Sequence, residues 1–341
     1  MHNNIFIIGN GFDLDLGLPT KYSDFANSEF WPKAKKQITQ NRVNYHHNND
    51  SGLKTISISL PKPILLEHHL DKKRKLDNWF DIENEILEYS KKEEKRPNYN
   101  HSDDVISQNN SYYLQLQNNL CDYILNIQNT AKINHDSVAY NVIKLIINNG
   151  FFNQIYSFNY TNIKKIIPEF NNTPDIIHIH GKVDDNSIIL GVDETPLKKG
   201  YECFHKSSSK YYSSHNLYKD ITNADEIVMF GLSFGRIDYS YFYNYFYNLS
   251  QIKDTPNDKK QNITIFTKDD NSRLDIISKL REMQINIQNL YAQSNFQIIC
   301  TNDGLDSPKL CEFKNRITNN SISNYFIPLI ANNKVPEQVM N

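Results

Sequence analysis

The chain has 341 residues, a net charge of −2 and a pI near 6.6, so nothing attracts it as a whole to nucleic acid or to an anionic membrane. Its mean hydropathy of −0.62 is polar, but 18 Phe and 21 Tyr argue against disorder. No apolar run reaches the length of a membrane span, and the N-terminus leads into a strand without a basic leader. We therefore expect a cytoplasmic protein that makes no membrane contact.

The first predicted element is a strand over residues 4–8, which ends in a glycine turn. Its apolar residues do not alternate with polar ones, which is typical of a strand in the centre of a sheet. Gly9 and Gly11 then allow the backbone to come close to a ligand. A helix starting here would attract an anion such as a nucleotide pyrophosphate. An ordinary structural turn is the alternative.

A long segment separates this strand from the next one, which is predicted at 153–157. Residues 31–75 are basic and interrupted by prolines, which indicates a loop. Residues 91–104 are charged and indicate a solvated stretch. Helical spacing of apolar residues predicts helices over 77–90, 111–128 and 135–148.

Strand and helix patterns alternate after residue 150, as in a parallel α/β sheet. We predict a Rossmann-like α/β domain made of residues 1–30 and 150–341, with residues 31–149 as a mostly helical insertion. Further strands are predicted at 176–179, 187–191, 226–231, 262–267 and 295–300, with helices at 207–222, 237–249 and 271–285.

Polar residues follow two of these strands, at the edge where α/β folds bind ligands. Asn159 and Thr161 come after 153–157, where they would cap a helix or contact a ligand. Alternation places His178 and His180 on the same side of their strand. Imidazole titrates near neutral pH, so a structural role, a metal site and a general base all remain open.

A glycine and a hydroxyl close the strand at 226–231. Gly231 and Ser233 suit phosphate or ribose binding, and Asp238 opens the next predicted helix. Residues 231–235 also match Gly-x-Ser-x-Gly, the pattern of a hydrolase nucleophile. The order of acid and histidine that such a hydrolase needs does not follow.

Five segments stand out by their composition and order: Gly9-Asn10-Gly11-Phe12-Asp13 with its continuation to Phe25, Trp79-Phe80-Asp81-Ile82-Glu83, Ser157-Phe158-Asn159-Tyr160-Thr161, His178-Ile179-His180-Gly181, and residues 231–238. As a set covering residues 4 to about 240, they resemble the AbiH family of bacterial abortive-infection proteins, which act against phage. The first of them, a glycine turn followed by a loop with Pro, Asp and Phe, is also distantly similar to the NAD-binding start of the sirtuins.

This resemblance implies a sirtuin-type Rossmann sheet that cleaves NAD, its substrate, into nicotinamide and ADP-ribose. Asn159 would position the attacking water and His180 would be the general base, with His178 beside it. Thr161 stands where the sirtuin pattern has Asp, and no metal is expected. The residues implied in nucleotide binding are Gly9, Asn10, Gly11, Asp13, Thr161, Gly231, Ser233 and Asp238.

Two other functions remain open. The same cleft would serve a sensor that binds a nucleotide without cleaving it, and the basic residues within 33–75 would serve a toxin that acts on nucleic acid. NAD or a related nucleotide is the expected small-molecule partner. A phage-derived trigger and a second copy of the chain are further expected partners.

Overall fold

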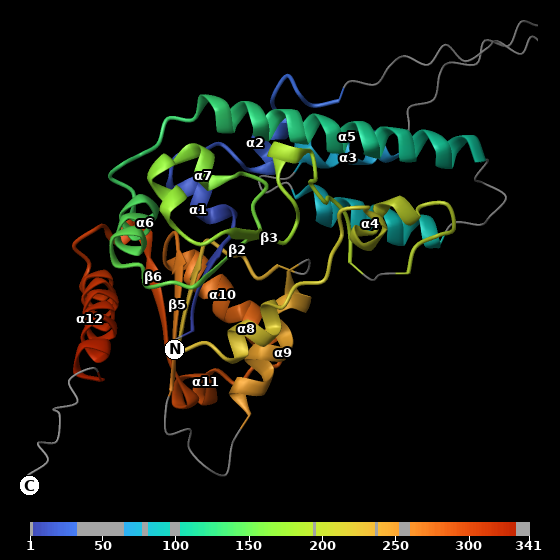
Figure 1. Cartoon of the computed structure of the whole chain (residues 1–341). Helices are drawn as coiled ribbons and strands as arrows, with labels where there is room; N and C mark the ends of the chain where they lie inside the picture. Colours follow the sequence, from blue (N-terminus) through green and yellow to red (C-terminus); the bar gives the residue numbers. More distant parts are fainter. Residues whose placement is uncertain are drawn as a thin grey trace, which may run out of the picture.

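Parallel strands form the centre of the protein. The computed structural model describes residues 3–32, 65–76, 81–95, 103–193, 196–235, 238–251 and 260–331. Within them, a six-stranded sheet has helices on both faces (Figure 1). The order is β3-β2-β1-β4-β5-β6, so the direction of winding reverses beside β1. The strands are β1 (Asn4–Ile8), β2 (Gln154–Ser157), β3 (Ile176–His178), β4 (Glu226–Phe230), β5 (Gln261–Thr267) and β6 (Ser294–Cys300).

The central position predicted for the first strand is confirmed. β1 is buried along its whole length and pairs with β2 on one side and β4 on the other. Ile8 lies opposite both Ser157 and Phe230, and Ser157 lies opposite His178. These four strands therefore end at the same level, and the segments that follow them meet at one edge.

The helices form two layers. α8–α11 share a hydrophobic core with one face of the sheet, and α1, α6 and α12 share a core with the other. No helix in the described part of the chain is long and apolar enough to cross a membrane. The helices are α1 (Asn10–Asp15), α2 (Tyr22–Ala26), α3 (Leu65–Leu76), α4 (Ile82–Glu94), α5 (Asp103–Thr130), α6 (Val138–Asn149), α7 (Ile163–Ile166), α8 (Leu217–Thr222), α9 (Tyr239–Ser250), α10 (Asp270–Glu282), α11 (Ile287–Gln293) and α12 (Pro308–Ala331).

The strand predicted at 187–191 is wrong. This apolar segment is a loop beneath α5, and side chains of α5 bind its carbonyl groups. Tyr113 Oη donates to the carbonyl of Leu190 at 2.5 Å, and Gln117 Nε2 donates to that of Ile188 at 2.7 Å. The backbone is therefore satisfied without a neighbouring strand.

Several helix predictions also need correction. The loop predicted over 31–75 ends in a helix, because Leu66 and Leu70 bury one face of α3. The stretch expected to be solvated begins inside α4, where Glu93 is buried. Only 217–222 of the helix predicted at 207–222 is α-helical. Residues 33–64 and 77–80 lie outside the described residues.

α5 covers the edge at which the strands end. Figure 1 shows α5 and α3 lying across the end of the sheet where β1 runs into α1. Tyr123 Oη donates to the carbonyl of Pro19, and Asn119 Nδ2 to that of Phe30, both at 2.8 Å. α3, α4 and α5 belong to the same hydrophobic cluster as Phe6. The division of the chain into two domains stays a prediction.

The segments after β1 and β4 touch through two glycines. A Cβ on Gly11 would lie 2.6 Å from Gly231 Cα, and one on Gly231 would lie 2.3 Å from the Phe12 nitrogen. Gly231 also has a φ of +71°, which side chains disfavour. The amide of Gly11 donates to the carbonyl of Gly231 at 2.9 Å. Glycine is therefore needed here for the packing of protein against protein, whatever the turn binds.

We expect Gly231→Ala to lower the free energy of unfolding by more than about 2 kcal/mol, because left-handed strain and a backbone clash act together. Urea denaturation measures this. Gly17→Ala is the matched control, since Gly17 has a φ of +91° and its added Cβ would have its nearest neighbouring heavy atom at 3.8 Å, an ordinary contact distance. The control should lose only about 1 kcal/mol of strain energy. Equal losses in the two variants would contradict the packing explanation.

Candidate functional site

A buried polar cluster lies where β1, β2 and β3 end. Asp13 is in α1 directly after β1, Asn159 and Thr161 follow β2, and His180 follows β3. Each of these four side chains is buried. Buried polar groups are costly unless they are hydrogen-bonded, so their partners indicate what the cluster does.

Asp13 is the centre of the first network. Thr161 Oγ1 donates to Asp13 Oδ2 at 2.7 Å, and Asn159 Nδ2 donates to Asp13 Oδ1 at 2.8 Å. Asn159 Nδ2 also donates to the carbonyl of Gly9 at 3.1 Å. These two acceptors fix the orientation of the Asn159 amide.

Asn159 Oδ1 points the other way. This oxygen is buried and accepts no hydrogen bond from the described residues. Buried amide oxygens almost always have a donor. Asn159 therefore presents a fixed acceptor that a hydroxyl or amide of a ligand would satisfy.

Burial raises the pKa of Asp13 to about 7, although the hydrogen bonds from Thr161 and Asn159 work against the shift. The carboxyl group therefore changes its charge near neutral pH, where a carboxyl in water is fully ionised.

His180 belongs to a second network. Its Nε2 atom lies 3.5 Å from Lys206 Nζ and 3.6 Å from Asp238 Oδ1. Lys206 Nζ in turn lies 3.5 Å from Glu83 Oε1. Phe158 and Tyr241 pack against the imidazole, with ring centroids 5.4 and 5.9 Å away. A cation, an imidazole and two carboxyl groups are thus linked by distances of 3.5–3.6 Å.

The charges in this network shift one another. Burial and the nearby Lys206 lower the pKa of His180 to about 4, so the imidazole is neutral at physiological pH. Burial raises the pKa of Glu83 to about 8, although Lys206 opposes that shift. Burial would raise the pKa of Asp238, but the close approach of His180 and Lys206 holds it below its usual value.

Local structure explains how the side chain of Lys206 comes to lie beside His180 and that of Glu83 beside Lys206. The Lys206 amide donates to the carbonyl of Val192, and the Val192 amide to that of Phe204, which joins two loop segments side by side. Gly191 makes this possible, because a Cβ there would lie 2.3 Å from the carbonyl oxygen of Phe204. Glu83 lies in the first turn of α4, and its Oε1 accepts the Gly191 amide at 3.2 Å.

The sequence analysis missed Lys206 and named Glu83 only as part of the segment of residues 79–83. Lys206 is only 1 % exposed, and its contact with Glu83 joins residues far apart in the chain. Lys206 lies in a loop, and loops have no periodic pattern of apolar residues that would indicate which side chains are buried. The single signal is that Glu83 follows an apolar residue at the start of an amphipathic helix.

The other predicted residues have partners outside the side chains of these two networks. The amide of Gly9 donates to the carbonyl of Phe230, and Asn10 Oδ1 accepts the Thr20 hydroxyl at 2.6 Å. Ser233 is exposed and its Oγ accepts the Gly235 amide at 3.4 Å. His178 Nδ1 lies 3.1 Å from the carbonyl oxygen of Asn159. Their roles in nucleotide binding stay predictions.

The alternative chemistries gain no support from these contacts. Within the described ranges, no group of three or more His, Cys, Asp and Glu residues is arranged to hold a metal ion. His180 faces Lys206 and Asp238, whereas a hydrolase histidine would face the nucleophilic serine.

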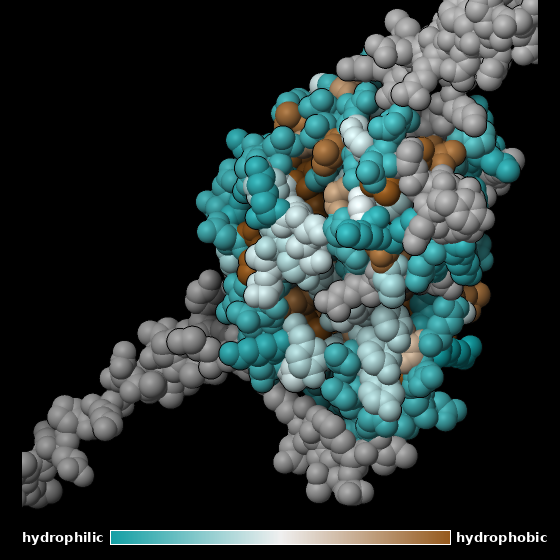
Figure 2. Space-filling model, turned by 90° about the vertical axis from the view of Figure 1, so that its right-hand side faces the viewer, coloured by the Kyte–Doolittle hydropathy of each residue, from teal (hydrophilic) through white to brown (hydrophobic). Residues whose placement is uncertain are grey.

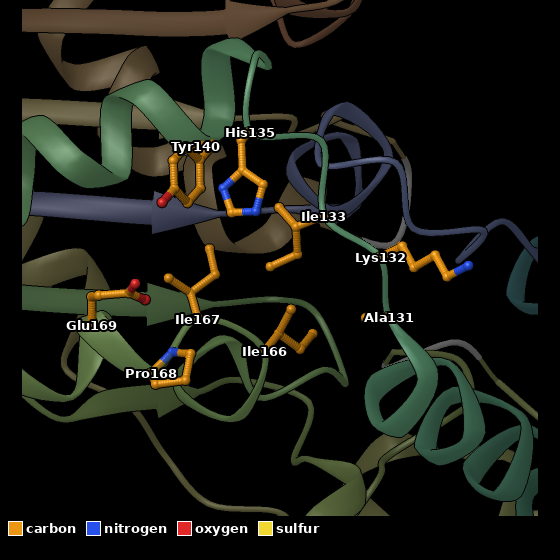
Figure 3. Close-up of a pocket in the computed structure, with 9 residues that line it drawn as sticks. All are labelled: Ala131, Lys132, Ile133, His135, Tyr140, Ile166, Ile167, Pro168 and Glu169. Atoms are coloured by element: carbon orange, nitrogen blue, oxygen red, sulfur yellow. The ribbon is translucent and has the colours of Figure 1, made fainter.

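A separate groove of about 420 Å³ lies between the end of α5 and α7. In Figure 3 the rings of His135 and Tyr140 lie together over Ile166 and Ile167, with Lys132 and Glu169 at opposite ends; the two ring centroids are 4.4 Å apart. None of the predicted site residues lines this groove.

On the face shown in Figure 2, hydrophobic side chains gather in small recesses among hydrophilic ones.

We expect Asp13→Asn to flatten the dependence of stability on pH. The folded pKa of Asp13 lies above its unfolded value of 3.8, so its stabilising contribution is complete below about pH 4 and is lost as the pH rises to about 7. The slope is at most about 1.4 kcal/mol per pH unit. The melting temperature of the wild type minus that of the variant should therefore fall across this range.

Asp136→Asn, which changes an exposed loop carboxylate, is the matched control. It should follow the wild type at every pH. A difference between wild type and Asp13→Asn that does not change with pH would contradict the assignment of Asp13 as the titrating group.

Comparison with known proteins agrees with the resemblance seen in the motifs. A family model described as Bacteriophage abortive infection AbiH matches residues 5–265. No curated protein matches the chain significantly, and no solved structure does. The match covers more than half of the chain and includes every residue of both networks. The chain therefore belongs to the bacteriophage abortive infection AbiH family, which indicates a role in abortive infection of phage.

Proposed function

We propose that the chain hydrolyses NAD to nicotinamide and ADP-ribose at the edge formed by β1, β2 and β3. The observation that carries this proposal is the buried Asn159 Oδ1, to which no described residue donates a hydrogen bond, one strand away from the neutral imidazole of His180. A ribose hydroxyl supplies the missing donor, and a neutral imidazole accepts a proton.

The sheet supports a dinucleotide as the ligand. Its strand order is the one used by Rossmann folds, in which dinucleotides bind where the strand order reverses. Here the order reverses beside β1, and Asp13 and Asn159 lie directly beyond that point. The sirtuin-like reading of the motifs agrees with this choice of ligand.

The proposed reaction needs few groups. The oxygen of a water molecule bonds to C1′ of the nicotinamide ribose as the bond from C1′ to the pyridinium nitrogen breaks. The bond electrons neutralise the pyridinium ring, and nicotinamide leaves without needing a proton. The water proton passes to His180, while Asn159 holds the water or the ribose in line.

The two alternatives have less support. A sensor would bind NAD at the same edge of the sheet and would differ only in releasing no nicotinamide.

A toxin that acts on nucleic acid would rely on the basic residues within 33–75. In the described part of that stretch, Lys73 lies 3.6 Å from Glu85, and Arg74 pairs with Asp71 at 2.8 Å. Both cations thus already face carboxylates of the protein.

We expect His180→Ala to lower the rate of nicotinamide release by about 10²–10⁴-fold, which is typical for loss of a general base. Asn159→Ala should cause a comparable loss. Chromatography of NAD incubated with each purified protein, with and without lysate of phage-infected cells, measures this. His135→Ala, in the separate groove, is the matched control and should keep full activity.

Unchanged nicotinamide release by His180→Ala would contradict the proposal. So would the absence of release by the wild type under both conditions. Binding of NAD without release would instead support the sensor, and isothermal calorimetry with NAD would detect it.

A further inference from the structure

Lys206 is a charged residue of the site to which the proposed reaction assigns no role. Only 1 % of it is exposed, although a buried ammonium group is expensive unless it is paired. Its Nζ atom lies 3.5 Å from Glu83 Oε1 and 3.5 Å from His180 Nε2. One cation is thus shared between a carboxyl group and the imidazole that the reaction needs as a base.

The chemistry of the two nitrogens decides what this contact does. An ammonium group can only donate hydrogen bonds, so the Nε2 atom facing it must be the acceptor. The Nε2 lone pair that accepts from Lys206 is the same lone pair that would accept a proton during the reaction. Protonating Nε2 would also place an imidazolium 3.5 Å from an ammonium, which the like charges oppose.

The remaining groups around His180 do not cancel this effect. Asp238, at the start of α9, lies 3.6 Å from Nε2 and favours the imidazolium. Tyr241 of the same helix packs on the ring, and His215 contributes a weaker repulsion to a protonated His180. The net result is the lowered pKa of His180, in which Lys206 is the largest influence after burial.

We propose that Lys206 is a restraint on His180, which keeps Nε2 from accepting a proton while the site is empty of an anionic ligand. The proposal rests on the proposed function in one respect, because that function makes His180 the base. A ligand carrying a diphosphate would pair with Lys206 and draw it away from Nε2. NAD has such a group, so the substrate itself would release the base.

The test is an NMR titration of His180 in protein labelled with ¹⁵N-histidine. Lys206→Met keeps the length of the side chain and removes its charge. We expect the titration midpoint of His180 to rise by about one pH unit or more, as for loss of a neighbouring like charge. Lys206→Gln is a second, shorter neutral variant, and it should give the same direction of shift. The His180 signal is identified by its absence from His180→Asn.

Glu83→Gln is the matched control. The pKa of Glu83 is about 8, so this group is already uncharged over the range in which His180 titrates. Glutamine keeps the acceptor for the Gly191 amide, and the midpoint of His180 should stay where it is in the wild type. A general loosening of the fold would shift the His180 midpoint alike in Lys206→Met and in Glu83→Gln.

Midpoints in Lys206→Met and Lys206→Gln that equal the wild-type value would overturn the restraint. The titration uses no substrate, so this result is independent of NAD cleavage. If the midpoint rises as expected but no variant releases nicotinamide, the restraint stands and the proposed function fails. A faster release of nicotinamide by Lys206→Met than by the wild type, without phage lysate, would support both the restraint and the proposed function.

Discussion

The contact between Gly11 and Gly231 is the constraint on which the arrangement of the site depends. It brings the segments after β1 and β4 together, with backbone against backbone, at the point where the order of strands reverses. Asp13 follows within the same short helix, so the contact also fixes where its carboxyl group lies. Asn159 is then oriented by Asp13 and by the Gly9 carbonyl. Because this packing turns the Asn159 amide nitrogen toward Asp13 and Gly9, its Oδ1 faces away from them and accepts no hydrogen bond within the described part of the chain.

The helices between β1 and β2 complete the site. α4 supplies Glu83, and α5 holds the loop of 188–190 in place through side chains that bind its carbonyl groups. That loop leads through Gly191 to Lys206 and so to His180. α4 brings Glu83 to Lys206, and the start of α9 brings Asp238 to His180. The charge state of His180 therefore depends on segments far from it in the sequence.

The sequence predicts the parts of this architecture that local patterns determine. The unbroken apolar run of 4–8 indicates a central strand, and polar residues directly after strands, such as Asn159 and His180, must meet at one edge. Residues 187–191 have the same apolar character as a strand, but α5 satisfies their backbone instead. The pairing of Glu83 with Lys206 depends on tertiary structure alone, and no local pattern of either residue could predict it.

The most direct test of the account is a crystal structure of the protein with ADP-ribose, the proposed product. We expect the ribose that carried nicotinamide to donate a hydroxyl hydrogen bond to Asn159 Oδ1, with His180 beside it and the diphosphate near Lys206. Binding of ADP-ribose in the groove between Lys132 and Glu169, or no binding at millimolar concentration, would contradict a dinucleotide site at this edge of the sheet.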